Sequence, residues 1–241
     1  MQPVVLLHGL IGPFADERAV THLRPAVVLS PDLLGYGPEA DVNPQGITID
    51  AQVEYMRTTL DTRAPNTRVH LVGHSVGGVI AASFAHGYPD RVESFVNVEG
   101  NFALADAFWS TQVATQTLDQ VNAMLEADRA DPARWLRESG VEPTGDRIRS
   151  AAEALAYQPA GTIQVTARAV VEYTGLTAGA VKSRPIRSGA FAAAGSATVV
   201  RCRRRRRTPA SPMARMTRAT RLWFTAWPPP SRSWAVTLGT P

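Results

Sequence analysis

The chain has 241 residues, of which 44% are hydrophobic and 19% are charged, so it is long enough to bury a sizeable core in one domain. Its single cysteine excludes an internal disulfide, and the lack of any run of 18 apolar residues predicts no membrane span. The net charge of +4 is the sum of two unlike parts, because residues 1–172 hold 12 Arg and 21 acidic residues, whereas residues 173–241 hold 13 basic residues and no acidic ones.

Two short apolar runs near the N-terminus predict buried strands, each followed by a turn. The first is residues 4–7 (Val-Val-Leu-Leu), which His8 and Gly9 follow directly. The second is residues 27–29, which lead into Asp32 and a segment with two glycines. Aspartate and glycine are typical of a turn that leaves a buried parallel strand, so we expect Asp32 to shape and bond this loop rather than to act as a catalytic acid.

A helix, a third strand and a second helix come next. Residues 49–63 place four apolar residues on one helical stripe, namely Ile49, Val53, Met56 and Leu60. Residues 69–72 (Val-His-Leu-Val) form an apolar run, and residues 79–85 have the composition of a buried helix. Strands that alternate with helices predict an α/β fold with a parallel sheet.

The segment between the third strand and its helix predicts a nucleophile. Residues 73–78 are Gly-His-Ser-Val-Gly-Gly, which matches Gly-x-Ser-x-Gly at Gly73, Ser75 and Gly77. Between a strand and a helix, this motif indicates a nucleophile elbow, a strained turn in which a β-carbon at the flanking positions would clash. The serine then lies at a helix N-terminus, whose partial positive charge favours an oxyanion. An ordinary glycine-rich turn is the alternative.

Two backbone N–H groups are predicted to face the serine as an oxyanion hole. One belongs to Val76, directly after Ser75, and the other to Leu10, in the turn after the first strand. Because the backbone does this chemistry, we interpret His8 as a structural histidine that shapes the turn with Gly9. His74 adjoins the serine, a position from which it is not expected to act as the base.

After a short strand at 95–98, residues 102–180 turn mostly helical. Asp131 is interpreted as an N-cap, followed by Pro132 in the first helical turn, with Gly140 as a helix stop. The aromatic residues of this block could line a pocket, but each is expected to serve in helix packing: Phe102, Phe108, Trp109 and Trp135.

These motifs, in this order and spacing, resemble the α/β-hydrolase fold family. The resemblance rests on residues 8–10, 32–37, 73–78 and 88–92, and it covers roughly residues 3–186. It implies a parallel sheet with helices on both faces, a helical cap at about 101–180 and a Ser–His–acid triad. Esterases, lipases and carbon–carbon bond hydrolases all remain open, whereas serine as the nucleophile argues against relatives with an aspartate nucleophile, such as epoxide hydrolases.

The same resemblance places the triad acid and histidine after the serine. Some members carry the acid at the end of the strand that here precedes Glu99; Asp106 is a weaker candidate, and a loop carboxylate is the alternative for Glu99. The last histidine in the chain is His86. It lies 11 residues after Ser75 on the elbow helix, which is about 16 Å at ~1.5 Å per residue. We therefore expect the base that takes the serine proton to be absent.

Residues 187–241 form an Arg-, Ala- and Pro-rich tail, with five consecutive arginines at 203–207. We interpret the tail as a C-terminus read out of frame, because its amino acids have GC-rich codons and the apolar strand expected after residue 186 does not follow. A genuine basic arm for nucleic acid or anionic membranes and a noncatalytic hydrolase-like binding protein are the alternatives. We expect a disordered tail, missing C-terminal strands and an exposed sheet edge near residues 93–98.

The sequence thus predicts a serine hydrolase that acts on an ester or on a related acyl or carbon–carbon bond, impaired for want of its histidine. A noncatalytic protein that binds nucleic acid or anionic surfaces through its tail is the less favoured alternative. A small-molecule substrate is expected, and no cofactor or metal is implied, because no metal cluster or phosphate-binding glycine loop occurs. One cysteine and no basic, apolar leader predict a cytoplasmic location. The substrate and the oligomeric state stay open.

Overall fold

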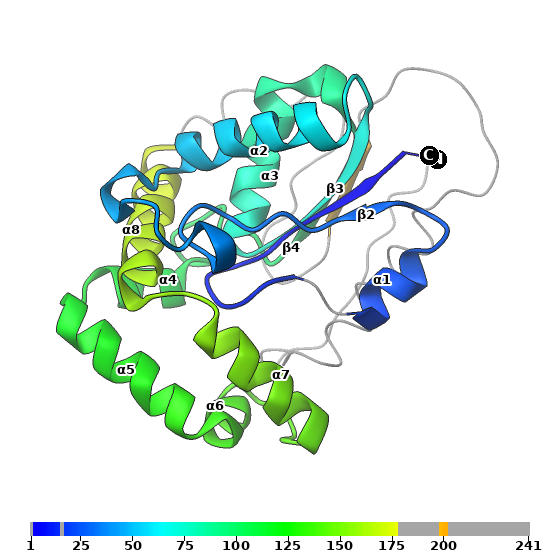
Figure 1. The fold of residues 1–241 in the computed structure, drawn as a ribbon. Helices are drawn as coiled ribbons and strands as arrows, with labels where there is room; N and C mark the ends of the chain where they lie inside the picture. Colours follow the sequence, from blue (N-terminus) through cyan, green and yellow to red (C-terminus); the bar gives the residue numbers. More distant parts are fainter. Residues whose placement is uncertain (1, 15–16, 178–197, 202–241) are drawn as a thin grey trace.

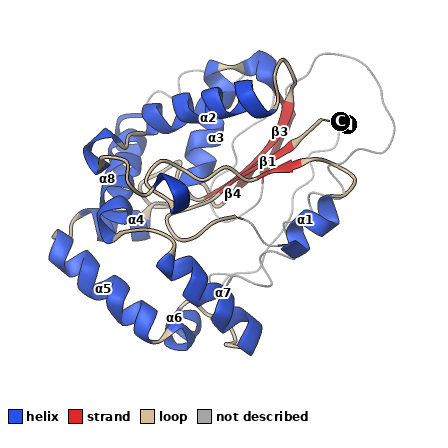
Figure 2. Ribbon diagram, viewed as in Figure 1, coloured by secondary structure: helices blue, strands red, loops and turns tan. Residues whose placement is uncertain are grey.

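The computed structural model describes residues 2–14, 17–177 and 198–201, which form a sheet with helices on both sides (Figures 1 and 2). The strands follow the order β2-β1-β3-β4-β5 across the sheet. The first four are parallel and the last is antiparallel: β1 (Val4–Leu7), β2 (Val28–Leu29), β3 (Val69–His74), β4 (Val92–Val98) and β5 (Thr198–Arg201). The predicted α/β class and its parallel sheet are confirmed.

The register of the central strands brings the motif-bearing turns to one edge of the sheet. Leu7 of β1 pairs with Gly73 of β3, which in turn pairs with Asn97 of β4. Because these strands are parallel, the turns that follow them begin side by side. The loop that starts at His8, the segment around Ser75 and the loop after β4 therefore share one edge.

Helices cover both faces of this sheet (Figure 1). On one side lie α2 (Ile49–Arg63), α3 (Val76–Gly87) and α8 (Ala160–Thr177), and on the other lies α1 (Glu17–Leu23). The predicted helical block consists of α8 and the four helices that precede it in the chain: α4 (Phe108–Ala114), α5 (Leu118–Ala130), α6 (Pro132–Glu138) and α7 (Gly145–Ala156). Three single-turn 3₁₀ helices complete the described elements: Gly37–Glu39, Pro44–Gly46 and Pro89–Arg91.

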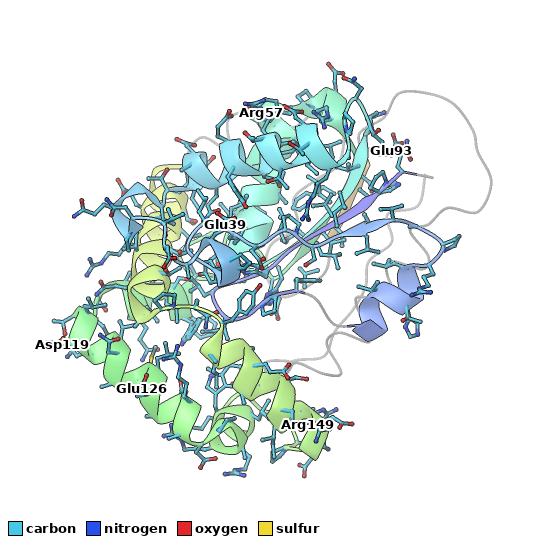
Figure 3. All side chains as sticks on the ribbon, in the orientation of Figure 1. Glu39, Arg57, Glu93, Asp119, Glu126 and Arg149 are labelled. Carbon is cyan, nitrogen blue, oxygen red and sulfur yellow. The ribbon has the colours of Figure 1, made fainter. Side chains whose placement is uncertain are left out.

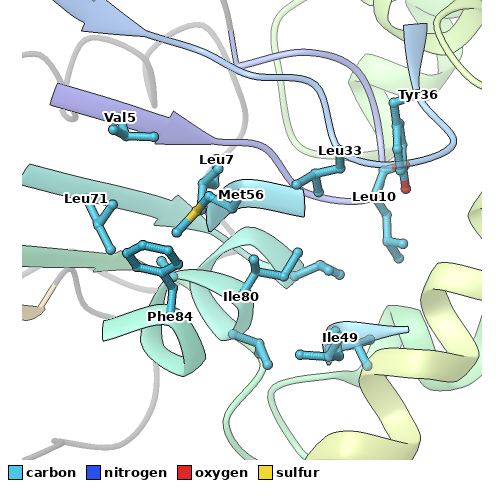
Figure 4. Packing of buried hydrophobic residues seen from close by; sticks show 14 of the residues in the cluster. Val5, Leu7, Leu10, Leu33, Tyr36, Ile49, Met56, Leu71, Ile80 and Phe84 are labelled. Carbon is cyan, nitrogen blue, oxygen red and sulfur yellow. The ribbon is translucent and has the colours of Figure 1, made fainter. Parts of the chain in front are cut away.

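Both faces of the sheet are buried, which explains why its strands are nearly continuous apolar runs. Leu7 belongs to the same hydrophobic cluster as Phe84 of α3 (Figure 4). The neighbouring Leu6 points to the opposite face, as alternation along a strand requires, and joins Leu23 of α1 in a second cluster. The core therefore holds the sheet rigidly beneath the turns at its edge.

Local signals place the helices where the sequence predicts them. α2 has the expected bounds, and Ile49, Met56 and Leu60 of its stripe are buried. The carboxylate of Asp131 accepts the Arg134 N–H at the start of α6, as an N-cap does. Charged side chains of this block point outward, among them Asp119, Glu126 and Arg149 (Figure 3). Over the described ranges, no helix is both long and apolar enough to span a membrane.

The expectation of an exposed edge at β4 is wrong. β5 pairs with β4 in the antiparallel sense, with Val200 opposite Phe95. Residues 198–200 are all β-branched and so favour a strand, and the unpaired N–H and C=O groups of an edge bind a strand of either direction. The family resemblance implies a parallel strand after residue 186, so this antiparallel one was not foreseen. The rest of the predicted tail, residues 187–197 and 202–241, lies outside the described residues.

Candidate active site

Ser75 lies between β3 and α3 in the strained conformation expected of an elbow. Its φ of 53° and ψ of −120° lie outside the regions that residues with a side chain commonly adopt. Such a conformation costs on the order of 1–3 kcal/mol and persists only where its surroundings enforce it. Here the Ser75 N–H donates to the carbonyl of Val98 at 2.9 Å, and the Gly78 N–H donates to the carbonyl of Ser75 at 2.9 Å.

Neither flanking glycine has room for a side chain. A Cβ on Gly73 would lie 2.3 Å from the carbonyl oxygen of Gly77, and a Cβ on Gly77 would lie 2.4 Å from the carbonyl oxygen of Leu7. Both obstacles are backbone atoms, which a side-chain rotation cannot move. Glycine at these two positions therefore lets α3 approach β1 and β3 closely enough to form the elbow.

The hydroxyl of Ser75 is bound by Asn101, a residue that the sequence did not single out as functional. Ser75 Oγ donates to Asn101 Oδ1 at 3.1 Å, and Asn101 is buried. The other end of the amide fixes its orientation, because Nδ2 donates to the backbone carbonyl of Asp106 at 2.9 Å, a group that can only accept. The amide oxygen must then face the serine, so the serine hydroxyl is the donor.

Helix α8 also binds Asn101, through the backbone of that residue. The buried Thr174 donates from Oγ1 to the backbone carbonyl of Asn101 at 2.6 Å. Asn101 is thus fixed through both its side chain and its backbone. No local pattern identifies it, because it lies 26 residues after Ser75 in the loop between β4 and α4 and depends on α8 for its position.

The turn after β1 passes close to the serine. A Cβ on Gly9 would lie 3.2 Å from the Cβ of Ser75 and 2.9 Å from Nδ1 of His74. Leu10 follows directly, while Val76 is the first residue of α3, so its N–H has no acceptor within that helix. The two residues predicted to supply oxyanion donors therefore belong to segments that meet at Ser75.

His8 uses both nitrogens of its ring within the loops of this edge. Nδ1 lies 2.8 Å from the carbonyl oxygen of Gly9, and Nε2 lies 3.1 Å from the N–H of Leu33. The Leu33 N–H can only donate, so Nε2 accepts and Nδ1 carries the hydrogen. Burial lowers the pKa of His8 to about 4, which keeps the ring neutral. These contacts agree with the structural role predicted for His8.

Glu99 directly follows β4 beside the elbow and contacts His74. Its Oε2 lies 3.6 Å from Nε2 of His74, and the two side chains are 24% and 12% exposed, respectively. Glu99 has a φ of 51°. Three non-glycine residues of the described ranges have a positive φ, and two of them, Ser75 and Glu99, lie at this site. The third, Asn66, lies in a turn, and asparagine adopts a positive φ more readily than most residues. Backbone strain is therefore concentrated at the elbow.

Three further histidines lie on parts of the fold away from this edge. His70 lies near the start of β3, where its Nδ1 is 2.7 Å from Ser94 Oγ. His86 lies in the last turn of α3 and His22 in the last turn of α1. The distance expected between His86 and Ser75 thus agrees with the helix that joins them.

The other acidic candidates bind groups of the protein. Asp32 accepts a hydrogen bond from the Tyr157 hydroxyl at the end of α7. This partner lies 125 positions away in the sequence, whereas the sequence predicts a bond within the loop of Asp32. The Asp106 carboxylate accepts the Ala103 N–H at 3.2 Å. Both carboxylates thus have structural contacts.

The aromatic residues of the helical block mostly pack against the main core. Phe102, Trp109 and Trp135 are partly buried against it, as predicted, whereas Phe108 is 71% exposed. Over the residues that the structure describes, no group of three or more His, Cys, Asp or Glu side chains is arranged to hold a metal ion.

Comparison with protein families matches residues 2–141 to the alpha/beta hydrolase fold. The chain is 34% identical over 145 residues to Lipase LipV of Mycobacterium tuberculosis, a match that covers 59% of this chain and 51% of that protein. It is 32% identical over 145 residues to 2-hydroxy-6-oxo-2,4-heptadienoate hydrolase of Pseudomonas putida, across 53% of this chain and 50% of that protein. The matches thus span about half the length of these relatives.

Solved structures show the same architecture. An epoxide hydrolase of Bacillus megaterium superposes with a TM-score of 0.54 at 18% identity, covering 70% of this chain and 65% of that one. A hydrolase of Pseudomonas aeruginosa superposes with a TM-score of 0.53 at 23% identity, covering 71% and 64%. At these identities the likeness concerns the fold alone.

Proposed function

Because the chain belongs to the alpha/beta hydrolase fold family, we propose that it is built as a serine hydrolase whose nucleophile is Ser75. The observation that carries the proposal is the strained backbone of Ser75 at the N-terminus of α3. The substrate is an ester or a related acyl or carbon–carbon bond in a small molecule. Similarity to a lipase and to a 2-hydroxy-6-oxo-2,4-heptadienoate hydrolase supports this class.

In the proposed reaction, Ser75 Oγ attacks the carbonyl carbon of the substrate, and the carbonyl oxygen becomes an oxyanion. The N–H groups of Val76 and Leu10 donate hydrogen bonds to that oxygen, and the N-terminus of α3 adds a favourable field. The Oγ–C bond forms, the leaving group departs with a proton, and water then hydrolyses the acyl-enzyme.

The step that this chain supports poorly is removal of the serine proton. In a triad, a histidine held by an acid does this. Here Glu99 is the proposed acid, but its carboxylate faces His74, and the only histidine after Ser75 is His86 at the far end of α3. Asn101, which binds the hydroxyl, is an amide and is not a base at neutral pH. Without one triad member, the acceleration left over water is ~10³–10⁴-fold.

A fluorophosphonate probe tests the role of Ser75. In the labelling reaction the Oγ–P bond forms, fluoride leaves and the hydroxyl proton passes to solvent. Because this chain lacks a base for the serine proton, we expect labelling to be slow. After long incubation it should approach one equivalent on the peptide that contains Ser75, measured by mass spectrometry. Ser75→Ala should abolish it. The control is Ser83→Ala, which alters a serine of the same helix that bonds to Tyr173 and should leave labelling unchanged. Label that survives Ser75→Ala contradicts the assignment.

Hydrolysis of a p-nitrophenyl ester separates the nucleophile from a complete enzyme. We expect little or no steady-state release of p-nitrophenol. A turnover number near the ~10 s⁻¹ that is typical of enzymes, abolished by Ser75→Ala, would support the nucleophile but contradict the proposed impairment.

The alternative function, binding of nucleic acid or anionic surfaces, depends on the arginines at 201 and 203–207. Arg201 ends β5, whereas the five arginines at 203–207 lie outside the described ranges. No observation on the described residues favours this function over the hydrolase site.

A further inference from the structure

The two residues that directly follow α7, Tyr157 and Gln158, bind the loops that follow β1 and β2. The Gly12 N–H donates to Gln158 Oε1 at 2.8 Å, although the two residues are 146 positions apart in the chain. One residue earlier, the carbonyl of Tyr157 accepts the Gly37 N–H at 3.1 Å, and the Tyr157 hydroxyl donates to Asp32. A single short segment of the helical block thus fixes two loops at the edge of the sheet that carries Ser75.

The side-chain amide of Gln158 can take only one orientation. The Gly12 N–H donates and cannot accept, so the amide oxygen must face it. On the opposite side, Nε2 donates to the carbonyls of Ala154 at 3.0 Å and Leu155 at 3.4 Å, which can only accept. Gln158 is 1% exposed, so no water competes for these contacts. A residue without both an acceptor and a donor here leaves a buried group unpaired.

Arg129 of α5 holds this segment in turn. Its Nε donates to the carbonyl of Leu155 at 2.9 Å, and its Nη2 donates to the carbonyl of Gln158 at 2.9 Å. A cation beside the last carbonyls of α7 satisfies acceptors that the helix itself leaves free. The position of Gln158 is therefore set by α5 and α7, and not by the loop of residues 10–12 that it binds.

The loop of residues 10–12 is held on its other side by Tyr36. The Tyr36 hydroxyl donates to the carbonyl of Leu10 at 3.3 Å, and the two residues adjoin in Figure 4. Gly12 has a φ of 66°, and a Cβ there would lie 2.6 Å from the Cβ of Ala154. The backbone between these anchors, which starts at Leu10, therefore has little freedom.

We infer that Gln158 is a positioning residue for the oxyanion hole. By fixing Gly12, it holds the peptide units of residues 10–12 and with them the orientation of the Leu10 N–H relative to Ser75. This inference rests on the proposed function, since it assigns Gln158 to the same site. An oxyanion donor is effective only when it lies within about 2.7–3.1 Å of the developing charge, so small shifts of this loop slow the chemistry.

The test compares Gln158→Leu with Gln164→Leu in the full chain. Gln164 is also a buried glutamine, and its Nε2 donates to the carbonyl of Gln116, away from the loop. Both changes remove a buried amide and should lower stability to urea. Gln158→Leu leaves the Gly12 N–H unpaired, whereas in Gln164→Leu the Gln116 carbonyl still accepts from Arg168 Nη2 at 3.3 Å. The readout is the second-order rate constant for labelling of Ser75 by a fluorophosphonate. We expect the rate constant to fall by about tenfold or more in Gln158→Leu and to stay near that of the parent in Gln164→Leu.

Gln158→Glu provides a rescue variant, because the neutral carboxylic acid keeps an acceptor for Gly12 and a donor for Ala154. We expect its labelling rate, relative to that of the parent, to recover as pH falls and the buried acid is protonated. If Gln158→Leu unfolds, this recovery carries the test alone. Equal slowing in the two leucine variants, or no recovery in Gln158→Glu, overturns the inference and leaves Ser75 as the nucleophile. If the parent itself is not labelled at Ser75, the proposed function fails, and the inference fails with it.

Discussion

Gly77 carries a hydrogen atom where any other residue would place a Cβ against the backbone of β1. The nearest atoms to that Cβ would be the carbonyl oxygens of Leu7, at 2.4 Å, and of His8, at 2.5 Å. Both oxygens belong to the strand end that leads into the loop at Leu10. The glycine thus links the start of α3 to the other half of the proposed oxyanion hole.

Gly77→Ala should therefore destabilise the protein by about 1–3 kcal/mol, as overpacking against rigid neighbours does. The matched control is Gly87→Ala in the same helix, where an added Cβ meets no atom within 4 Å. That change should be neutral or stabilising by up to about 1 kcal/mol, since alanine has less freedom in the unfolded chain. Urea unfolding measures both variants, and equal free energies of unfolding would contradict the steric argument.

His8 makes a second residue-scale prediction, through pH. Burial lowers its pKa to about 4 from the ordinary 6.5, so between these values the unfolded chain binds a proton that the folded chain refuses. The free energy of unfolding therefore rises with pH across this window. The stabilising contribution of His8 is fully present above about pH 6.5 and is lost as the pH falls towards 4. At ~1.36 kcal/mol per pKa unit, the loss attributable to His8 is roughly 3 kcal/mol.

His8→Asn should flatten this pH dependence, measured as urea midpoints from pH 7 to pH 4.5. The variant is expected to be less stable at pH 7, because asparagine cannot reproduce both bonds to Gly9 and Leu33. Burial also lowers the pKa of His70, so a residual slope of the same sign remains. An unchanged slope in the variant would show that His8 is not buried in its neutral form.

At the scale of elements, the helical block does more than cover the sheet. α8 positions Asn101 through Thr174, and the end of α7 positions the loop at Gly12 through Gln158. Two helices far along the chain therefore fix the nucleophile and its proposed oxyanion loop. Whatever moves these helices should alter the geometry around Ser75.

The pairing of β5 with β4 gives a prediction of its own. A chain truncated after residue 197 lacks β5 and leaves the outer edge of β4 unpaired. A chain truncated after residue 201 keeps β5 and its pairing. Both truncated chains lack residues 202–241, so they differ only in β5. Exposed edges promote association between chains. Light scattering at increasing concentration should show more aggregation for 1–197, and equal aggregation of the two chains would mean that β5 does not protect the edge.

At the scale of the whole molecule, the charge divides the chain. Residues 1–172 carry a net charge of −9, and the positive total comes entirely from residues 173–241. Apart from the last residues of α8 and β5, that basic part lies outside the described residues. The basic pI of about 9.7 therefore says little about the surface of the hydrolase fold. Any non-specific binding to polyanions is expected to come from the basic residues after position 172 rather than from the site at Ser75.

Several features of this protein are determined by short stretches of sequence. The strand at residues 4–7, the first four residues of the strand at 69–74, helix α2 and the turn at Ser75 follow from apolar runs, a helical stripe and glycines at fixed spacing. The structural contacts of His8 agree with the prediction from its place in a His-Gly turn. These features are local, because sterics and hydrogen bonding within a few residues decide them.

Tertiary structure alone decided the rest of the site. The bonds of Asn101 to Ser75, of Tyr157 to Asp32 and of Gln158 to Gly12 join residues 26, 125 and 146 positions apart. Asparagine, tyrosine and glutamine occur in loops and helices for many reasons, and no spacing identifies the few that packing brings together. The antiparallel pairing of β5 belongs to the same class, because a strand's partner and direction depend on which edge the fold leaves open.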